Sequence, residues 1–268
     1  MIGSNALARR LVAIAGIAGL IFLIVPLVIV IPMSFSSARA LTFPPPGLSL
    51  RWYEAFFGDA RWMSAMATSA SVAFVSSLLA LLLGGLAAYG LRRAPVRGEG
   101  VIEANFVAPL IVPTIIVAVA LYLGFAKIGL LGTYVGLVLA HTVLSVPLVI
   151  MVLTVAIRSF DFRIEQVAWS LGASRAYTIV KVVLPNLAPN VFAAWIFAFI
   201  SSFDEVIVTN FIAGTWDTVP KRMFNELILE INPTITAVAT LLIAFTMLAL
   251  AAVAVLLQRT GKLRPTML

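Results

Sequence analysis

The chain has 268 residues, of which 62% are hydrophobic and 11% charged, about half the charged fraction of an ordinary soluble domain. One globular core cannot bury so much apolar surface, so the composition excludes a soluble protein and indicates a membrane protein. The formal net charge of +7 does not indicate nucleic-acid binding, because the 18 Lys and Arg residues are spread singly between apolar runs. The sequence has no cysteine, which excludes disulfides and thiolate metal sites.

The first apolar run covers residues 11–33 and follows Arg9 and Arg10. It resembles a signal peptide, and the A-R-A sequence at 38–40 resembles a cleavage site. However, the run is longer than the ~7–15 residues of a signal-peptide core and matches the ~20 residues that cross a bilayer. We therefore predict an uncleaved first transmembrane helix.

Five further apolar runs are each long enough to span a membrane, and lipid requires that they be helical because it offers the backbone no hydrogen-bond partners. They cover residues 69–91, 105–125, 130–157, 191–212 and 235–257. Pro109 and Pro113 fall inside the third run, where each favours a kink, either as ordinary membrane-helix prolines or as a hinge. The sequence thus predicts an all-α membrane protein with six transmembrane helices in one domain, 1–268.

The positive charges in alternate loops predict the orientation, since cytoplasmic segments near helix ends carry excess Lys and Arg. One set of loops contains twelve: Arg9, Arg10, Arg92, Arg93, Arg97, Arg158, Arg163, Arg175, Lys181, Arg259, Lys262 and Arg264. The other contains six: Arg39, Arg51, Arg61, Lys127, Lys221 and Arg222. This asymmetry predicts that both termini and the loop 158–190 are cytoplasmic, and that 34–68 is external.

The loop 158–190 has the pattern of two short amphipathic helices. Gly172 is a favourable stop for the first helix, and Pro185 is expected to break a second helix that starts near Ser174. Such a pair presents an apolar face either to a cytoplasmic partner or to the membrane surface. The apolar residues of the first helix recur at helical spacing: Ile164, Val167, Ala168 and Leu171.

This loop resembles the E-A-A-x-x-x-G-x(9)-I-x-L-P signature of permease subunits of binding-protein-dependent ABC importers. Ala168, Gly172, Leu184 and Pro185 match it with the spacing intact. Gln166 stands where the family has Glu, Val167 replaces the first Ala, and Val182 replaces Ile. Glu165 lies one residue before the expected carboxylate, so either side chain could make the polar contact.

The resemblance implies the type I importer permease fold, with a coupling loop that docks into a cleft on a cytoplasmic ATPase. It implies the following coupling residues: Glu165, Gln166, Ala168, Gly172, Ala173, Ser174, Leu184 and Pro185. The segments 109–113, 130–141 and 202–209 are similar to polyamine-type permeases, of the second or C-type subunit. The implied partners in the bacterial inner membrane are two ATP-binding subunits, a second permease and an extracytoplasmic substrate-binding protein.

Asp204 and Glu205 lie inside the fifth apolar run, where each charge costs roughly 2.5–3.5 kcal/mol at a helix centre. On a continuous helix Glu205 shares a small, partly polar face with Ser201 and Thr209, whereas Asp204 shares an apolar face. We therefore expect Asp204, Glu205, Ser201 and Thr209 to contribute to a substrate pathway, with Glu205 meeting the substrate and Asp204 bonding a neighbouring helix. Alternatively, both carboxylates cap a broken helix or pair with a basic residue of the partner permease.

A carboxylate-lined pathway suits a cationic substrate, because a low-dielectric wall strengthens attraction between unlike charges. Together with the resemblance, this favours a polyamine such as spermidine or putrescine. Related permeases carry opines, phosphonates or other amines, and these remain alternatives.

The sequence contains no G-x-x-x-x-G-K-[ST] phosphate loop, so a separate subunit must hydrolyse ATP. His141 is the single histidine and has no second ligand at metal-binding spacing, so we expect it to be packed or hydrogen-bonded. We expect no cofactor, metal site or catalytic residue. The competing classes are a stand-alone channel, a secondary transporter, for which no matching inverted repeat is visible, and an intramembrane enzyme, for which no G-x-S-x-G is present.

Overall fold

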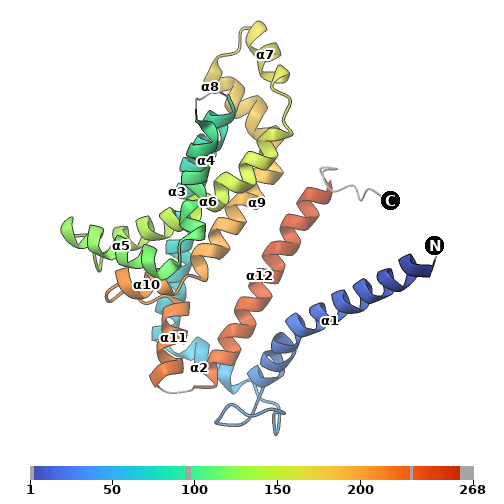
Figure 1. The fold of residues 1–268 in the computed structure, drawn as a ribbon. Helices are drawn as coiled ribbons and strands as arrows, with labels where there is room; N and C mark the ends of the chain where they lie inside the picture. The colour runs from blue at the N-terminus through green and yellow to red at the C-terminus, as the bar shows by residue number, and fades with distance from the viewer. Residues whose placement is uncertain (1–2, 94–97, 230–231, 260–268) are drawn as a thin grey trace. The chain divides into compact units, whose positions relative to one another are not determined.

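The computed structural model describes residues 3–93, 98–229 and 232–259, and these residues form helices joined by short segments (Figure 1). The chain divides into two compact units, 1–63 with 225–245 and 64–224 with 246–268. The helices are α1 Gly3–Ser34, α2 Arg51–Gly58, α3 Ala60–Arg93, α4 Glu99–Ile111, α5 Thr114–Lys127, α6 Tyr134–Arg158, α7 Arg163–Ser170, α8 Arg175–Thr178, α9 Leu184–Phe203, α10 Ile207–Ile212, α11 Val219–Leu229 and α12 Thr234–Arg259.

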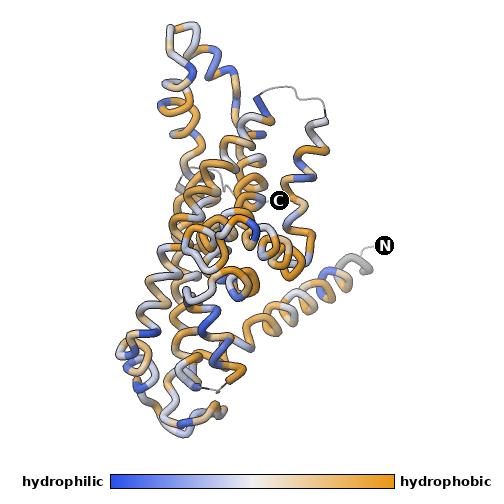
Figure 2. Tube along the Cα trace, turned by 90° about the vertical axis from the view of Figure 1, so that its left-hand side faces the viewer, coloured by the Kyte–Doolittle hydropathy of each residue, from blue (hydrophilic) through white to orange (hydrophobic). Residues whose placement is uncertain are grey.

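Within the described residues, five helices are long and apolar enough to cross a membrane, and the bent pair α4 and α5 makes a sixth span if counted as one. Figure 2 shows hydrophobic residues along these long helices. The predicted all-α membrane fold is therefore confirmed. The apolar side chains of α1 are exposed along most of its length in the isolated chain, as expected for a helix that faces lipid or another subunit.

In the first unit, polar and aromatic contacts fold the segment after α1. The Ser34 hydroxyl lies 2.8 Å from the Tyr53 hydroxyl, and the rings of Phe35 and Tyr53 are 5.2 Å apart. The Ser49 amide donates to the Phe35 carbonyl at 2.7 Å, so the chain returns to the end of α1 before α2 begins.

The third predicted span is not one helix, because α4 ends at Ile111 and α5 begins at Thr114 with a bend of 100°. Val112 is extended, with φ −69° and ψ 132°, as the steric demand of the following proline requires. Pro113 also has no amide hydrogen to continue the helix. The sequence predicted a kink in this region, but a continuous span over 105–125 is wrong.

The core of the second unit lies between α3, α6 and α9. Its buried side chains include Ala80 and Ala88 of α3, Val149 of α6 and Ala194 of α9. Small residues allow the helices to approach closely, which is how membrane helices gain packing contacts in the absence of a hydrophobic driving force. At Gly84 an added Cβ would lie 2.9 Å from Val149 Cγ1, so α3 and α6 pack closely at this position.

A second packed region joins α5 and α10. Ala118 of α5 and Ile212 of α10 are buried together, and the rings of Tyr122 and Phe211 meet edge to face. Close by, Gly132 and Gly214 both have positive φ, and a Cβ on Gly214 would lie 2.8 Å from the Gly132 Cα. The turn before α6 and the turn after α10 thus require glycine where they meet.

Pro185 does not break the helix, contrary to the prediction. α8 continues through a π-helical turn, Ile179–Val183, into α9, so that residues Arg175–Phe203 form one candidate span. Pro185 is the second residue of α9 and lies two positions after the end of this turn. A π turn shifts the hydrogen-bond register, which accommodates a residue that lacks an amide donor.

Candidate functional site

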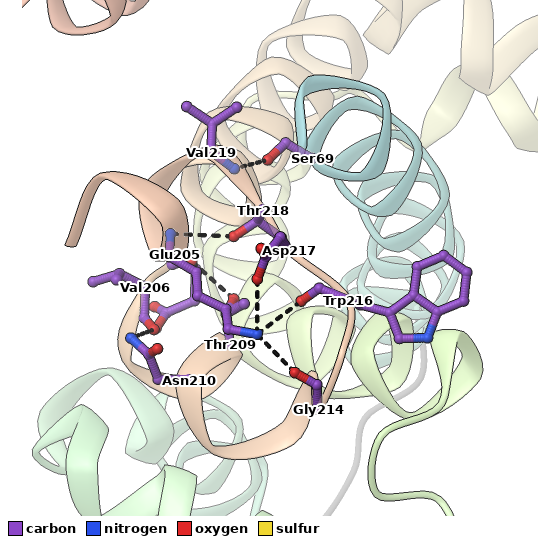
Figure 3. Close-up of polar contacts among 11 residues, drawn as sticks. Ser69, Glu205, Val206, Thr209, Asn210, Gly214, Trp216, Asp217, Thr218 and Val219 are labelled. Atoms are coloured by element: carbon purple, nitrogen blue, oxygen red, sulfur yellow. Dashed lines mark hydrogen bonds and ion pairs between the residues drawn. The ribbon is translucent and has the colours of Figure 1, made fainter. Parts of the chain in front are cut away.

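The fifth predicted span is interrupted at its two carboxylates. α9 ends at Phe203, and α10 begins only at Ile207. Glu205 Oε1 accepts a hydrogen bond from the Val208 amide at 2.8 Å. The Glu205 carbonyl accepts from the Thr209 hydroxyl at 2.9 Å (Figure 3). Glu205 thus satisfies a free amide of the first turn of α10, in the manner of a helix cap.

The helical faces predicted for these residues are therefore wrong, because no continuous helix carries Ser201, Glu205 and Thr209 together. Thr209 is fully buried, and Ser201 is half-buried. Asp204 is exposed, whereas the Glu205 carboxylate is half-buried and bonded to the backbone. The structure thus supports the alternative in which a carboxylate caps a broken helix. The capping carboxylate is that of Glu205.

A set of buried, hydrogen-bonded polar side chains lies next to this break and connects α3, α6, α9 and α10. His141 Nδ1 lies 2.8 Å from Ser202 Oγ, and His141 Nε2 lies 2.9 Å from Thr209 Oγ1. Ser202 Oγ also lies 2.9 Å from Ser76 Oγ of α3. The prediction of a hydrogen-bonded His141 is confirmed, and Thr209 is occupied by the contacts that hold α10 against α6.

The loop after α10 is held by Lys221, which the sequence analysis treated only as a topology charge. Its ammonium donates to the carbonyls of Gly214 and Trp216 at 2.8 and 3.0 Å and lies 3.1 Å from Asp217 Oδ1 (Figure 3). The Val219 amide donates to Ser69 Oγ at 2.8 Å, which ties the start of α11 to α3. No sequence motif marks this lysine, because its main partners are backbone carbonyls.

The loop 158–190 forms a compact hairpin at the end of the second unit that carries α7 and α8 (Figure 1). The Gly172 amide donates to the Trp169 carbonyl and the Ala173 amide to the Ala168 carbonyl, which together form a Schellman motif. Gly172 has φ +86°, a conformation that favours glycine. The hydroxyl of Ser174 then accepts from the Tyr177 amide and caps α8.

The start of α7 is fixed by Asp161, whose carboxylate accepts from the Arg163 amide and from its Nε, both at 3.0 Å. The hydrogen bond from the Arg163 side chain holds the pKa of Asp161 below its ordinary value. Asp161 therefore stays ionised through the neutral pH range and keeps this cap.

The tip of the hairpin presents an open, largely apolar surface. Leu171 is 82% exposed, and Val167 and Tyr177 are also exposed. A hollow of about 550 Å³ at the tip is lined by Ala168, Leu171, Gly172, Ala173, Ser174, Tyr177 and Val182. Four of the predicted coupling residues, Ala168, Gly172, Ala173 and Ser174, therefore lie on one concave surface.

The other predicted coupling residues lie elsewhere. Gln166 is exposed, and Leu184 and Pro185 are exposed at the start of α9, outside this hollow. Glu165 is fully buried, and its Oε1 accepts from the Tyr89 hydroxyl at 2.9 Å while its Oε2 lies 2.9 Å from Arg93 Nε. A direct contact between Glu165 and a partner protein is therefore wrong for this conformation.

Instead, Glu165 anchors α7 to the end of α3. Arg93 also stacks on Trp169, with its guanidinium carbon 4.7 Å from the ring centroid. The sequence analysis missed Tyr89 and Arg93, since Arg93 was counted only as a positive charge next to a span. A basic residue at the end of a span followed by a lone carboxylate in the next amphipathic loop is the pattern that could have indicated the pair.

These features define a polytopic, all-helical membrane protein with a helical hairpin of α7 and α8 and a helix that is broken between α9 and α10. The chain belongs to the family of binding-protein-dependent transport system inner membrane components, whose pattern it matches over residues 80–262. It is therefore a permease subunit of an ABC importer and not an enzyme.

Curated relatives cover most of the chain. The spermidine/putrescine transport system permease protein PotC of Haemophilus influenzae is 31% identical over 89% of this chain and 92% of its own length. The putrescine permease PotI of Escherichia coli strain K12 is 30% identical over 84% and 83%. The sulfoquinovosyl glycerol permease SmoH of Agrobacterium fabrum is also 30% identical, over 64% of this chain and 60% of its own.

Solved structures share the fold. A bacterial ABC transporter that imports alginate aligns with a TM-score of 0.67 over 97% of this chain and 98% of the other, at 15% identity. The methionine ABC transporter MetNI aligns with a TM-score of 0.60 over 75% and 98%, at 16% identity. These matches confirm the type I importer permease fold.

Proposed function

We propose that this chain forms one half of the translocation pathway of an ABC importer for a polyamine such as spermidine or putrescine. The observation that carries the proposal is the likeness to PotC and PotI, which extends over more than four fifths of the chain and of each relative. In this proposal the chain acts as a single transmembrane domain beside a second permease. Two ATP-binding subunits drive the cycle, and an extracytoplasmic binding protein delivers the substrate.

Asp204 is the better candidate for meeting a cationic substrate, which reverses the roles expected from the sequence. Its carboxylate is exposed at the end of α9, and no ion pair involves it in the described part of the chain. Glu205 is engaged with the Val208 amide and has a structural role. A carboxylate in a low-dielectric pathway attracts an ammonium group far more strongly than the same carboxylate in water.

The alternative substrates are opines, phosphonates and other amines. SmoH has a similar identity to this chain and is named for sulfoquinovosyl glycerol, which is not a polyamine. An anionic substrate such as a phosphonate would be repelled by Asp204. A cationic polyamine is therefore favoured over an anionic one by the charge of the pathway as well as by the relatives.

The hairpin of α7 and α8 is the site at which an ATPase subunit docks. Its tip offers an apolar hollow, which suits insertion into a cleft. The Schellman turn and the buried Glu165 make the hairpin rigid, so a displacement of the ATPase would move α3 and α9 rather than bend a loop. This role places the hairpin and both termini in the cytoplasm, as the distribution of positive charge predicts.

The test is uptake of radiolabelled spermidine or putrescine by cells that depend on this permease. Asp204→Asn keeps the size of the side chain and removes its charge, and we expect uptake to fall at least about tenfold, the loss of roughly one charge-assisted contact. Glu205→Gln is the matched control, because its amide oxygen still accepts from Val208, and we expect normal uptake. Normal uptake by Asp204→Asn at a normal complex yield would contradict the pathway role.

A further inference from the structure

A cavity between the hairpin and the end of α3 carries more positive than negative charge. It has a volume of about 370 Å³ and is lined by Tyr89, Arg93, Trp169, Arg175, Thr178 and Ile179. Glu165 forms an ion pair with Arg93 and neutralises its charge. The excess positive charge of the cavity therefore comes from Arg175.

Donors at this cavity have unused capacity. Arg175 is exposed, and its guanidinium carbon lies 6.0 Å from the Trp169 ring. The indole Nε1 of Trp169 is buried and has no acceptor among the described residues. An oxygen-rich anion bound in this cavity would accept charge-assisted hydrogen bonds from Arg175, the exposed donor that lines it.

The charged cavity continues into an apolar groove along α3 and α9. The groove shares Tyr89 and Ile179 with the charged cavity, has a volume of about 410 Å³, and is lined otherwise by apolar residues such as Leu82, Leu86 and Leu184. A further apolar hollow of about 590 Å³ shares Leu184 and reaches Phe74. From Tyr89 to Phe74 the lining extends roughly 22 Å at about 1.5 Å per residue, which exceeds one leaflet of a hydrocarbon core about 30 Å thick.

We propose that this combined site binds one anionic phospholipid, with the phosphate between Arg93, Trp169 and Arg175 and an acyl chain in the groove. A phosphate diester carries one negative charge, which balances the excess charge of the cavity. The inference rests on the proposed topology, which places the site in the cytoplasmic leaflet, where basic pockets between helices recognise lipid headgroups. Because the headgroup would bridge α3 with α7 and α8, the lipid would brace the coupling hairpin.

An acidic side chain of the ATPase is the competing occupant of the charged cavity. The groove favours the lipid, because Leu82 and Leu86 next to the cavity are exposed apolar side chains, which suit an acyl chain and not a carboxylate. The apolar hollow at the hairpin tip, which suits the ATPase, is lined by a different set of residues.

The experiment is native mass spectrometry of the purified importer complex, titrated with dioctanoyl phosphatidylglycerol and, separately, with dioctanoyl phosphatidylcholine. We expect one phosphatidylglycerol to be retained per copy of this chain, at least about tenfold more tightly than phosphatidylcholine, which has the same chains and a neutral headgroup. Inorganic phosphate alone should compete weakly, since it cannot use the groove. Equal retention of both lipids, or displacement by phosphate at the same concentration as by the lipid, would overturn the proposal.

Variants distinguish binding of the lipid headgroup from binding of the acyl chain. Arg175→Gln should remove the preference for phosphatidylglycerol, and Leu82→Trp should lower its retention by filling the groove. Arg163→Gln is the matched control, because Arg163 lies on the same hairpin but pairs with Asp161 and lines neither cavity. If Arg175→Gln loses the ATPase subunits while lipid retention is unchanged, the occupant is a protein carboxylate and the proposal is wrong.

Lipid retention is measured without ATP or substrate, so its result is independent of the transport assay. A complex that retains phosphatidylglycerol but transports no polyamine would contradict only the proposed function. A complex that transports polyamine without lipid preference would contradict only the lipid site.

Discussion

At the residue scale, two carboxylates show that the type of a side chain does not by itself predict its role in the protein. Glu165 and Glu205 were both expected to face a ligand or a partner. Glu165 instead bonds Tyr89 and Arg93, and Glu205 caps a short helix. In both residues the carboxylate satisfies donors that the fold would otherwise leave buried, which is a common reason for an acid in an apolar setting.

The bond between Tyr89 and Glu165 gives the first prediction at this scale. Tyr89→Phe keeps the ring and removes one of the two partners of a fully buried carboxylate, so we expect the free energy of unfolding to fall by about 1 kcal/mol. Denaturant unfolding of the purified chain in detergent measures the change. Tyr122→Phe is the control, because Tyr122 contacts Phe211 through its ring. Equal stability of the two variants would show that the bond to Glu165 contributes nothing.

At the element scale, the sequence predicts the long helices well and their interruptions poorly. Apolar runs require helices in lipid, so α3 and α12 contain the expected runs with longer ends, and α6 contains its expected run except for residues 130–133. The break at Phe203 depends on Glu205 reaching the Val208 amide and on the bond between Thr209 and His141, a contact between residues far apart in sequence. Hydropathy does not contain that information.

The hairpin was predicted more fully than the pathway. Gly172 was expected to end a helix, and it does so with a positive φ, because a local turn is governed by local chemistry. The anchor of the same hairpin was missed, since Arg93 and Glu165 are distant in sequence. The continuation through Pro185 was missed because a π turn has no simple sequence pattern.

Gly172 supplies the prediction at this scale. Gly172→Ala imposes only the strain of a side chain at positive φ, about 1–2 kcal/mol, and its Cβ meets open space. Gly172→Arg imposes the same strain and adds bulk at the docking surface. We expect the Gly172→Ala variant to have a transport rate within about twofold of normal. The Gly172→Arg variant should lose transport by more than about tenfold while it still inserts in the membrane. Equal transport by both variants would show that the tip is not a docking surface.

At the scale of the whole molecule, the exposed apolar length of α1 and the open hairpin tip indicate a subunit that is completed by lipid and by other chains. Large apolar surfaces of this kind mark interfaces or membrane contact. The family membership provides the same conclusion independently, because such permeases act in complexes.

The proposed topology is testable because the chain has no native cysteine. Ala40 and Ser170 are both exposed, and neither occupies a predicted site. We expect Ala40→Cys to react with an impermeant thiol reagent added to intact spheroplasts. Ser170→Cys should react only after the membrane is permeabilised. Labelling of both cysteines from the same side would exclude the proposed orientation.

The central claim is that this chain forms half of the translocation pathway of an ATP-driven polyamine importer, and reconstituted transport tests it most directly. The complex that copurifies with this chain is placed in proteoliposomes, and accumulation of radiolabelled spermidine and putrescine is measured with and without ATP and the binding protein. We predict accumulation of at least one polyamine only when both ATP and the binding protein are present. Accumulation without ATP, or an active ATPase complex that moves neither polyamine, would contradict the account.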